Sequence, residues 1–176
     1  MMALHTENDT ERADLIWRHP VYQEHFRNLQ DAERTREFCR HTLMHFLDVA
    51  RIAHILNLEN SYGIPKDIVY AAALLHDIGR SLQFSAGTPH DQASASLCTQ
   101  IMPDCGFSGS EISRVQSAIL YHRGHDLPEA LQDQHTRDPL AECLKRADKL
   151  SRNCFDCPAA HSCNWPCEKR NHSIFI

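Results

Sequence analysis

An apolar helix that ends in a histidine and an aspartate constrains this chain more than any other feature. The segment 68–80 reads IVYAAALLHDIGR, and its first eight residues carry no charged side chain. We expect such a helix to be buried, and burying an imidazole and a carboxylate side by side is costly unless both have partners. Coordination of a metal ion is one of the few ways to supply those partners. His76 and Asp77 are therefore the first candidate metal ligands.

Helical patterns with clear ends recur along the 176 residues, whereas strand patterns are nearly absent. We expect helices over about 10–19, 31–58, 65–78, 88–102, 108–122 and 140–152. The last 24 residues are rich in cysteine and have no aliphatic stripe. The prediction is an all-α fold with a helical bundle at 1–152 and a small cysteine-rich C-terminal extension at 153–176.

Composition and net charge limit the binding partners and the cellular compartment that we expect for this protein. A net charge of -5 argues against nucleic acid as the main partner, because duplex-binding proteins usually carry a basic surface. No apolar run is long enough to span a bilayer, and the polar N-terminus lacks a signal-peptide core, so we expect a cytoplasmic protein without a membrane partner. Thiols stay reduced in that compartment, so the 8 cysteines and 13 histidines point to metal before disulfide.

Several predicted helices carry a metal-competent side chain near their apolar stripe. These residues are His41 and His45, which share a face of the 31–58 helix, then His90, His122 and Asp148 in the three later helices. A single histidine on a core stripe is most often an ordinary core residue. The recurrence on successive helices indicates a shared site instead.

Three segments carry a resemblance to a known family. HFLDVARIA at 45–53, ALLHDIGR at 73–80 and RADKL at 146–150 resemble, in this order, the motifs of the HD-domain metal-dependent phosphohydrolase superfamily. The resemblance covers about 36–152 and implies an HD-domain helical bundle. Valine and alanine follow His45 as in the family's pattern, which makes His45 the motif histidine. His41 would then support the ligands from behind or face the substrate.

The resemblance also implies a ligand set. The implied ligands of a first divalent ion are His45, His76, Asp77 and Asp148. His90 and His122 match the two extra histidines of the binuclear branch, which includes symmetrical dinucleoside tetraphosphate hydrolases and several cyclic-nucleotide phosphodiesterases. Asp77 would bridge the two ions. Imidazole and carboxylate donors suit iron, manganese, nickel, cobalt or zinc, and the sequence does not choose between them.

The implied reaction is hydrolysis of a phosphate ester or anhydride, in a small, nucleotide-like substrate, by a metal-activated water. Two ions about 3.5–4 Å apart lower the pKa of a bound water and clamp phosphoryl oxygens, so no side-chain nucleophile is needed. Arg80 either reaches the phosphate as a bidentate donor or is a solvated arginine after a helix end. Arg123 and His125 are candidates to bind phosphate or to protonate the leaving group. The predicted catalytic residues are Asp77, Arg80 and His125.

The C-terminal extension carries a second candidate metal site. Its cysteines are Cys154, Cys157, Cys163 and Cys167, and the first pair has the spacing of a structural zinc knuckle. Zinc, an iron–sulfur cluster and free thiols all remain open. Further ligands could come from Cys143, His161 and His172, and from Cys39 if the extension folds back beside the 31–58 helix. A metal would order this polar segment.

Two other interpretations compete with a phosphohydrolase. One is a metal-holding module that senses a nucleotide without turnover, and the other is an interaction protein whose cysteine-rich extension is the working part. The complete set of ligands from His45 to Asp148 favours the enzyme. The sequence does not predict the oligomeric state.

Overall fold

The computed structural model describes residues 10–122 and 138–174. Its α-helices are α1 (Glu11–Arg18), α2 (Pro20–Ala32), α3 (Leu43–Glu59), α4 (Lys66–Leu75), α5 (Arg80–Ala86), α6 (His90–Ile101), α7 (Gly109–Tyr121) and α9 (Pro139–Leu150). Three 3₁₀ turns are η1 (Pro103–Cys105), η2 (Cys154–Asp156) and η3 (Cys167–Lys169). The described residues contain no strand, and the predicted all-α fold is confirmed.

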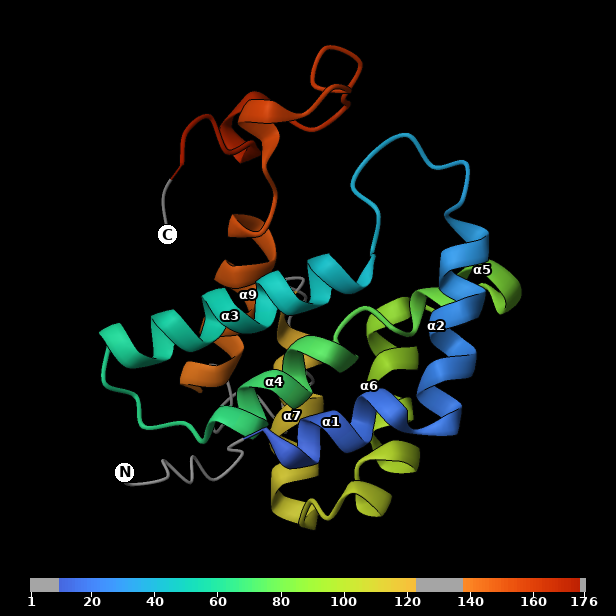
Figure 1. The fold of residues 1–176 in the computed structure, drawn as a ribbon, viewed down its shortest axis with the longest axis vertical. Helices are drawn as coiled ribbons and strands as arrows, with labels where there is room; N and C mark the ends of the chain where they lie inside the picture. The colour runs from blue at the N-terminus through green and yellow to red at the C-terminus, as the bar shows by residue number, and fades with distance from the viewer. Residues whose placement is uncertain (1–9, 123–137, 175–176) are drawn as a thin grey trace, which may run out of the picture.

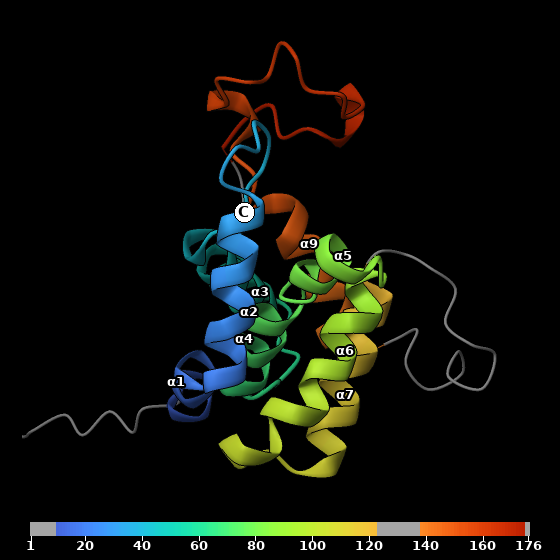
Figure 2. The same ribbon diagram turned by 90° about the vertical axis from the view of Figure 1, so that its right-hand side faces the viewer.

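The helices pack around one apolar core. Helix α3 crosses the body and packs mainly against α4 and α9, while α6 runs beside α7 (Figures 1 and 2). The core draws on all of these helices, with Phe46, Val49, Leu75, Ile78 and Ile119 fully buried. The C-terminal segment 153–174 lies outside this body in both views. None of the described helices is both long and apolar enough to span a bilayer.

The predicted helix from 31 to 58 is wrong in its first third. Helix α3 begins at Leu43, and residues 33–42 form a loop that closes around the buried Glu33 carboxylate. That carboxylate accepts hydrogen bonds from the His41 backbone N–H at 2.7 Å and from Arg36 Nη1 at 3.0 Å. A side-chain acceptor thus replaces helical hydrogen bonding, so His41 and His45 do not share a helix face.

Two helices were not predicted, and one predicted helix ends early. Pro20 follows α1 but also begins α2, because proline is well tolerated at the first position of a helix. Helix α4 ends at Leu75 rather than Ile78, and α5 follows from Arg80. Gly79 between them packs so closely on α6 that an added Cβ would lie 2.4 Å from the His90 carbonyl oxygen. The remaining predicted helices agree with the structure to within about two residues at each end.

An ion pair joins α1 to the start of α7. Arg12 donates to both carboxylate oxygens of Glu111, at 3.1 and 2.9 Å, and Glu111 forms a capping box with Ser108. The hydrogen bonds from Arg12 are the main cause that lowers the pKa of Glu111 to about 2.

We expect Glu111→Gln to reduce the free energy of unfolding at pH 7 by about 1 kcal/mol, a value discounted for solvent screening. Because the folded-state pKa lies below the ordinary 4.5, this stabilisation is present above pH 4.5 and is lost as pH falls towards 2. Urea unfolding from pH 7 to pH 2 measures the difference, with the exposed Glu59→Gln as control. A difference that stays constant down to pH 2 would contradict the role of the Arg12 pair.

Candidate metal centre

Helix ends deliver six side chains into one cluster. They are His45 in the first turn of α3, His76 and Asp77 directly after α4, His90 at the start of α6, His122 directly after α7, and Asp148 in the last turn of α9. Their ligand atoms form two groups, each with all atoms within 4.8 Å of one another. The first group contains His45, His76, Asp77 and Asp148, and the second contains Asp77, His90 and His122.

Asp77 lies at the junction of the two groups. Its Oδ2 is 3.5 Å from His76 Nε2, while its Oδ1 is 3.1 Å from His90 Nε2 and 3.9 Å from His122 Nε2. The two carboxylate oxygens thus face different sets of imidazoles. This is the arrangement that a carboxylate needs in order to bridge two ions.

The histidine rings are oriented by the protein through their other nitrogen. The Nδ1 partners are the Ser151 hydroxyl for His45, the Ala73 carbonyl for His76, the Gln83 side-chain carbonyl for His90 and the Ile119 carbonyl for His122. Each ring therefore directs Nε2 towards the carboxylates. Outer hydrogen bonds of this kind fix the tautomer and the direction of metal-binding histidines.

The residues fit a metal because their inward atoms are otherwise unsatisfied. His45 Nε2 and His76 Nε2 are buried and have no hydrogen-bond partner among the described residues. Leaving such atoms unpaired costs about 1–3 kcal/mol each. Nitrogen and carboxylate oxygen donors together suit the divalent transition metals.

Protonation states in the cluster also favour metal binding. Burial, reinforced by the neighbouring His76, lowers the pKa of His45 to about 3, and burial likewise lowers the pKa of His122. Burial alone would raise the pKa of Asp77, but His76 and Arg80 hold it well below the ordinary value. A neutral imidazole at His45 and His122 and an ionised carboxylate at Asp77 are the forms of these side chains that bind metal.

His41 lies behind Asp77 and not on α3. Its Nε2 is 3.1 Å from Asp77 Oδ2, and its Nδ1 is 2.7 Å from Glu33 Oε1. Burial alone would lower the pKa of His41, but the hydrogen bonds to Asp77 and Glu33 raise it. The ring thus links a buried glutamate to the central aspartate.

Two arginines contact the carboxylates of the cluster. Arg80 Nε lies 3.0 Å from Asp77 Oδ2 and its side chain is 19% exposed, so Arg80 is not a solvated arginine. Arg152 Nη2 lies 3.2 Å from each carboxylate oxygen of Asp148. Arg152 was not predicted as a site residue. It lies four residues after Asp148, just beyond the end of α9.

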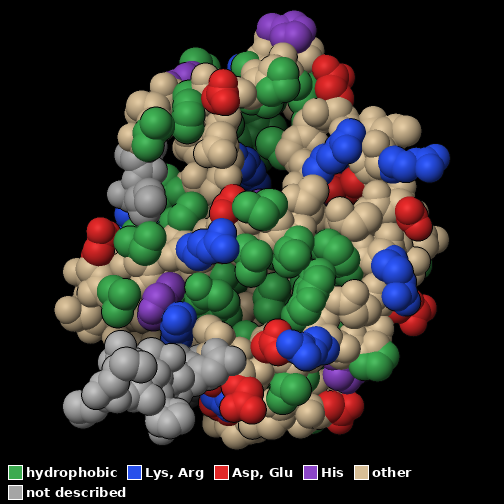
Figure 3. Space-filling model, in the orientation of Figure 1, with side chains coloured by type: hydrophobic (Ala, Val, Ile, Leu, Met, Phe, Trp, Pro, Cys, Tyr) green, Lys and Arg blue, Asp and Glu red, His purple; other side chains and the backbone are tan. Residues whose placement is uncertain are grey.

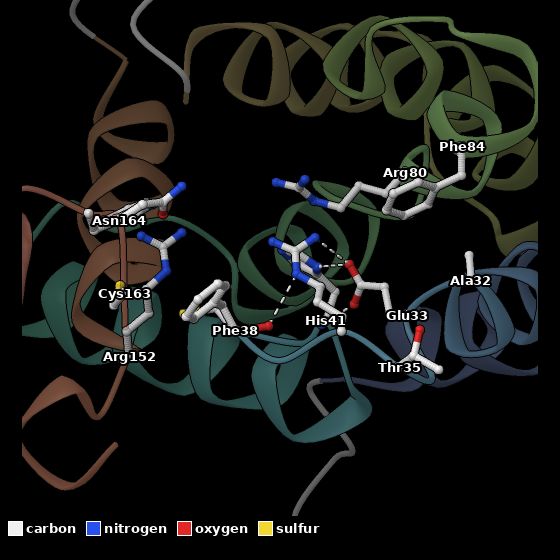
Figure 4. Close-up of a pocket in the computed structure, with 13 residues that line it drawn as sticks. Ala32, Glu33, Thr35, Phe38, His41, Arg80, Phe84, Arg152, Cys163 and Asn164 are labelled. Atoms are coloured by element: carbon white, nitrogen blue, oxygen red, sulfur yellow. Dashed lines mark hydrogen bonds and ion pairs between the residues drawn. The ribbon is translucent and has the colours of Figure 1, made fainter. Parts of the chain in front are cut away.

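A cavity of about 530 Å³ adjoins the cluster. Its lining includes three arginines (Arg36, Arg80 and Arg152), three aromatic residues (Phe38, Phe84 and Trp165), and also Glu33 and His41. Figure 4 shows Arg152 and Phe38 on one side and Arg80 and Phe84 on the other. The surface is hollowed between the C-terminal segment and the helical body (Figure 3). Glu33, Arg36 and Trp165 carried no signal in the sequence, because segments distant in the chain form this cavity.

The structure leaves two groups of predicted site residues untested. Arg123 and His125 lie outside the described residues. Cys154, Cys157, Cys163 and Cys167 lie in the C-terminal segment, and all eight cysteines of the chain are free thiols. Their role as ligands stays a prediction.

Comparisons with known proteins agree in one family. The sequence model of the HD domain matches residues 42–153. An uncharacterized protein of Clostridium beijerinckii is 39% identical over 165 residues, which cover 94% of this chain and 99% of that protein. Ribonuclease Y of a Sulfurovum species is 27% identical over 113 residues, but these are 64% of this chain and 20% of the ribonuclease. The crystal structure of a predicted HD superfamily hydrolase from an uncultured Thermotogales bacterium has a similar fold, with a TM-score of 0.53 and 24% identity over 78% of this chain and 71% of the other.

Proposed function

The chain belongs to the HD-domain family of metal-dependent phosphohydrolases, and from this premise we propose that it hydrolyses a phosphate ester or anhydride of a small, nucleotide-like substrate. The observation that carries the proposal is the position of the arginine-lined cavity. Arg80 and Arg152 border the cavity and also contact Asp77 and Asp148 of the metal cluster. A phosphate held by these arginines would therefore lie next to the ions.

The arginines are suited to bind an anion. Arg152 Nη1 is buried and has no hydrogen-bond partner among the described residues, and its guanidinium lies 4.1 Å from the centre of the Trp165 ring. Stacking on Trp165 and pairing with Asp148 fix the guanidinium plane, which leaves a donor to meet a phosphate oxygen.

The aromatic side chains of the cavity favour a substrate with a flat ring. Phe38, Phe84 and Trp165 line it together with the arginines. Base stacking on aromatic side chains is worth about 1–3 kcal/mol and tolerates any base. This supports a nucleotide-like substrate over an aliphatic phosphate ester.

These contacts suggest a separate role for each group in the proposed reaction. Bound divalent ions would supply an activated water and charge stabilisation at the phosphoryl group. The arginines would orient the phosphate, and the C-terminal segment and the 33–42 loop would shield it from bulk water. His41 would hold Asp77 in position from behind.

A substrate screen tests the proposal. The purified protein is reconstituted separately with manganese, iron, cobalt, nickel and zinc, and phosphate release or product formation is measured with nucleoside mono-, di- and triphosphates, dinucleoside polyphosphates and cyclic nucleotides. A short RNA is included because ribonuclease Y, by its name, acts on RNA. Metal-dependent hydrolysis of a nucleotide is expected. Tight nucleotide binding with no turnover under any metal would favour the sensor instead.

We expect Arg80→Lys to lower kcat/KM by about tenfold to a hundredfold, because lysine cannot make the bidentate contact of a guanidinium. Metal content should be retained, since Arg80 contacts Asp77 but belongs to neither group of candidate ligands. Arg51→Lys on the exposed face of α3 is the matched control and should behave as wild type. Equal kcat/KM values for Arg80→Lys and wild type would place phosphate binding elsewhere.

A further inference from the structure

The C-terminal segment is ordered without an apolar core of its own. Among residues 153–174 only Ala159 is buried. Segments that bury so little apolar surface usually need a disulfide or a metal to stay folded. None of the cysteines of this segment forms a disulfide.

Polar contacts to backbone give the segment a defined shape. Arg170 donates hydrogen bonds to three carbonyls of the segment, those of Ala160 at 2.9 Å, Cys163 at 2.6 Å and Trp165 at 2.8 Å. Asn171 donates to the carbonyls of Lys149 at 2.8 Å and Arg152 at 2.7 Å, which ties the segment to the end of α9. The turn that carries Cys163 is therefore held in place.

The 33–42 loop reaches this segment and brings a further cysteine to it. Ser162 Oγ donates to Glu37 Oε1 at 2.9 Å, and Cys39 and Cys163 line the same cavity. In Figure 2 the loop rises to the level of the C-terminal segment, in agreement with the hydrogen bond between Ser162 and Glu37. Burial is the main cause that raises the pKa of the Cys39 thiol, Arg152 opposes it, and the neighbouring thiols of Cys154, Cys157 and Cys163 raise it further.

Cys167 has a different environment. It is exposed, and its Sγ lies 3.4 Å from His172 Nε2. The cysteine pattern in the sequence groups Cys167 with the other three cysteines of the segment. In the fold, Cys39 lines the same cavity as Cys163 and is close enough to all three for their charges to act on it.

We propose that Cys39, Cys154, Cys157 and Cys163 bind a second metal centre through their thiolates, and that this centre ties the 33–42 loop to the C-terminal segment. Four thiolates are the ligand set of structural zinc and of iron–sulfur clusters. No three described cysteines have sulfurs mutually within 4.8 Å. Zinc would draw the sulfurs to about 3.8 Å, from a Zn–S distance of about 2.3 Å, whereas a cluster fills a wider space between them.

The consequence for the cavity rests on the proposed function. The loop supplies Arg36, Phe38 and His41, and the segment supplies Trp165. A metal that joins the two would hold both walls of the substrate cavity. Loss of this metal should then raise KM for the substrate while the ions at Asp77 remain bound.

The test compares full-length Cys39→Ser, Cys157→Ser and Cys167→Ser with wild type. All proteins are purified without oxygen, and zinc, iron and acid-labile sulfide are measured per chain. An Asp77→Asn protein is measured in parallel, and its metal content gives the amount bound outside the histidine–aspartate cluster. We expect that amount to be missing from the metal content of Cys39→Ser and Cys157→Ser and to be present in Cys167→Ser. Sulfide with iron identifies a cluster, and zinc alone identifies a zinc site.

A second measurement needs no variant. The wild-type protein is alkylated, and the modified cysteines are identified by mass spectrometry. Without a chelator, Cys167 should be modified and the four proposed ligands should be protected. After a chelator is added, the four proposed ligands should be modified as well. Full metal content in Cys39→Ser, or its loss in Cys167→Ser, would overturn the proposed ligand set. If the wild-type protein bound no metal other than the ions that depend on Asp77, the proposed cysteine site would be overturned. Because these readouts are independent of turnover, an inactive protein would contradict only the proposed hydrolysis.

Discussion

Asp77→Asn is expected to remove bound metal from the histidine–aspartate cluster and to reduce hydrolysis by about a thousandfold or more. Asp77 is the only residue that belongs to both groups of candidate ligands among the described residues. Asparagine keeps the shape of the side chain but loses the charge that two ions share. Metal ions supply several kcal/mol of transition-state stabilisation, and each tenfold change in rate corresponds to about 1.4 kcal/mol. Loss of the ions therefore accounts for the expected decrease in hydrolysis.

The measurement is metal content per chain together with kcat/KM on the substrate found by the screen. Asp48→Asn is the matched control. The Asp48 side chain is 37% exposed, and its ion-pair partner is Arg51 at 3.4 Å, which is not a residue of the metal cluster. The control should keep both metal and activity. An Asp77→Asn protein that hydrolyses the substrate at the wild-type rate would show that the cluster is not the catalytic centre.

Gly79→Ala is expected to destabilise the protein by about 3 kcal/mol, the upper end of the usual cost of overpacking. The added Cβ would lie 2.4 Å from both the His90 carbonyl oxygen and the Ser94 backbone nitrogen, and backbone atoms cannot swing aside as side chains do. The turn after α4 must therefore separate from the start of α6. This moves His90 away from Asp77 and should weaken binding at the second group of ligands.

Urea unfolding of the metal-free protein measures the stability, and a metal titration measures the loss at the second group. Gly109→Ala is the control, because an added Cβ there meets no atom within 4 Å. Gly109 lies at the start of α7, where alanine is expected to be neutral or slightly stabilising. If the two variants had equal stability, the close approach of the turn to α6 would be contradicted.

The sequence predicted the fold class and the family because both depend on local patterns. The apolar helix before His76, the capped start of α7 and the prolines and glycines between helices all act within a few residues. The order of the histidines and aspartates along the chain indicated one cluster. The structure brings these six side chains together at helix ends.

The parts that failed depend on contacts between distant segments. The loop at 33–42 was predicted as helix because nothing local shows that Glu33 is buried and accepts the His41 backbone N–H. The cavity needs the C-terminal segment to meet this loop, and the spacing of cysteines alone does not show that Cys39 and Cys163 line it together. Chain topology decides both.

The most direct test of the central claim is anomalous diffraction from crystals of the protein grown with manganese. We predict one peak between His45, His76, Asp77 and Asp148, and a second between Asp77, His90 and His122, with the two about 3.5–4 Å apart. A manganese-loaded crystal with no anomalous peak within reach of Asp77 would contradict the metal centre, and with it the proposed hydrolysis.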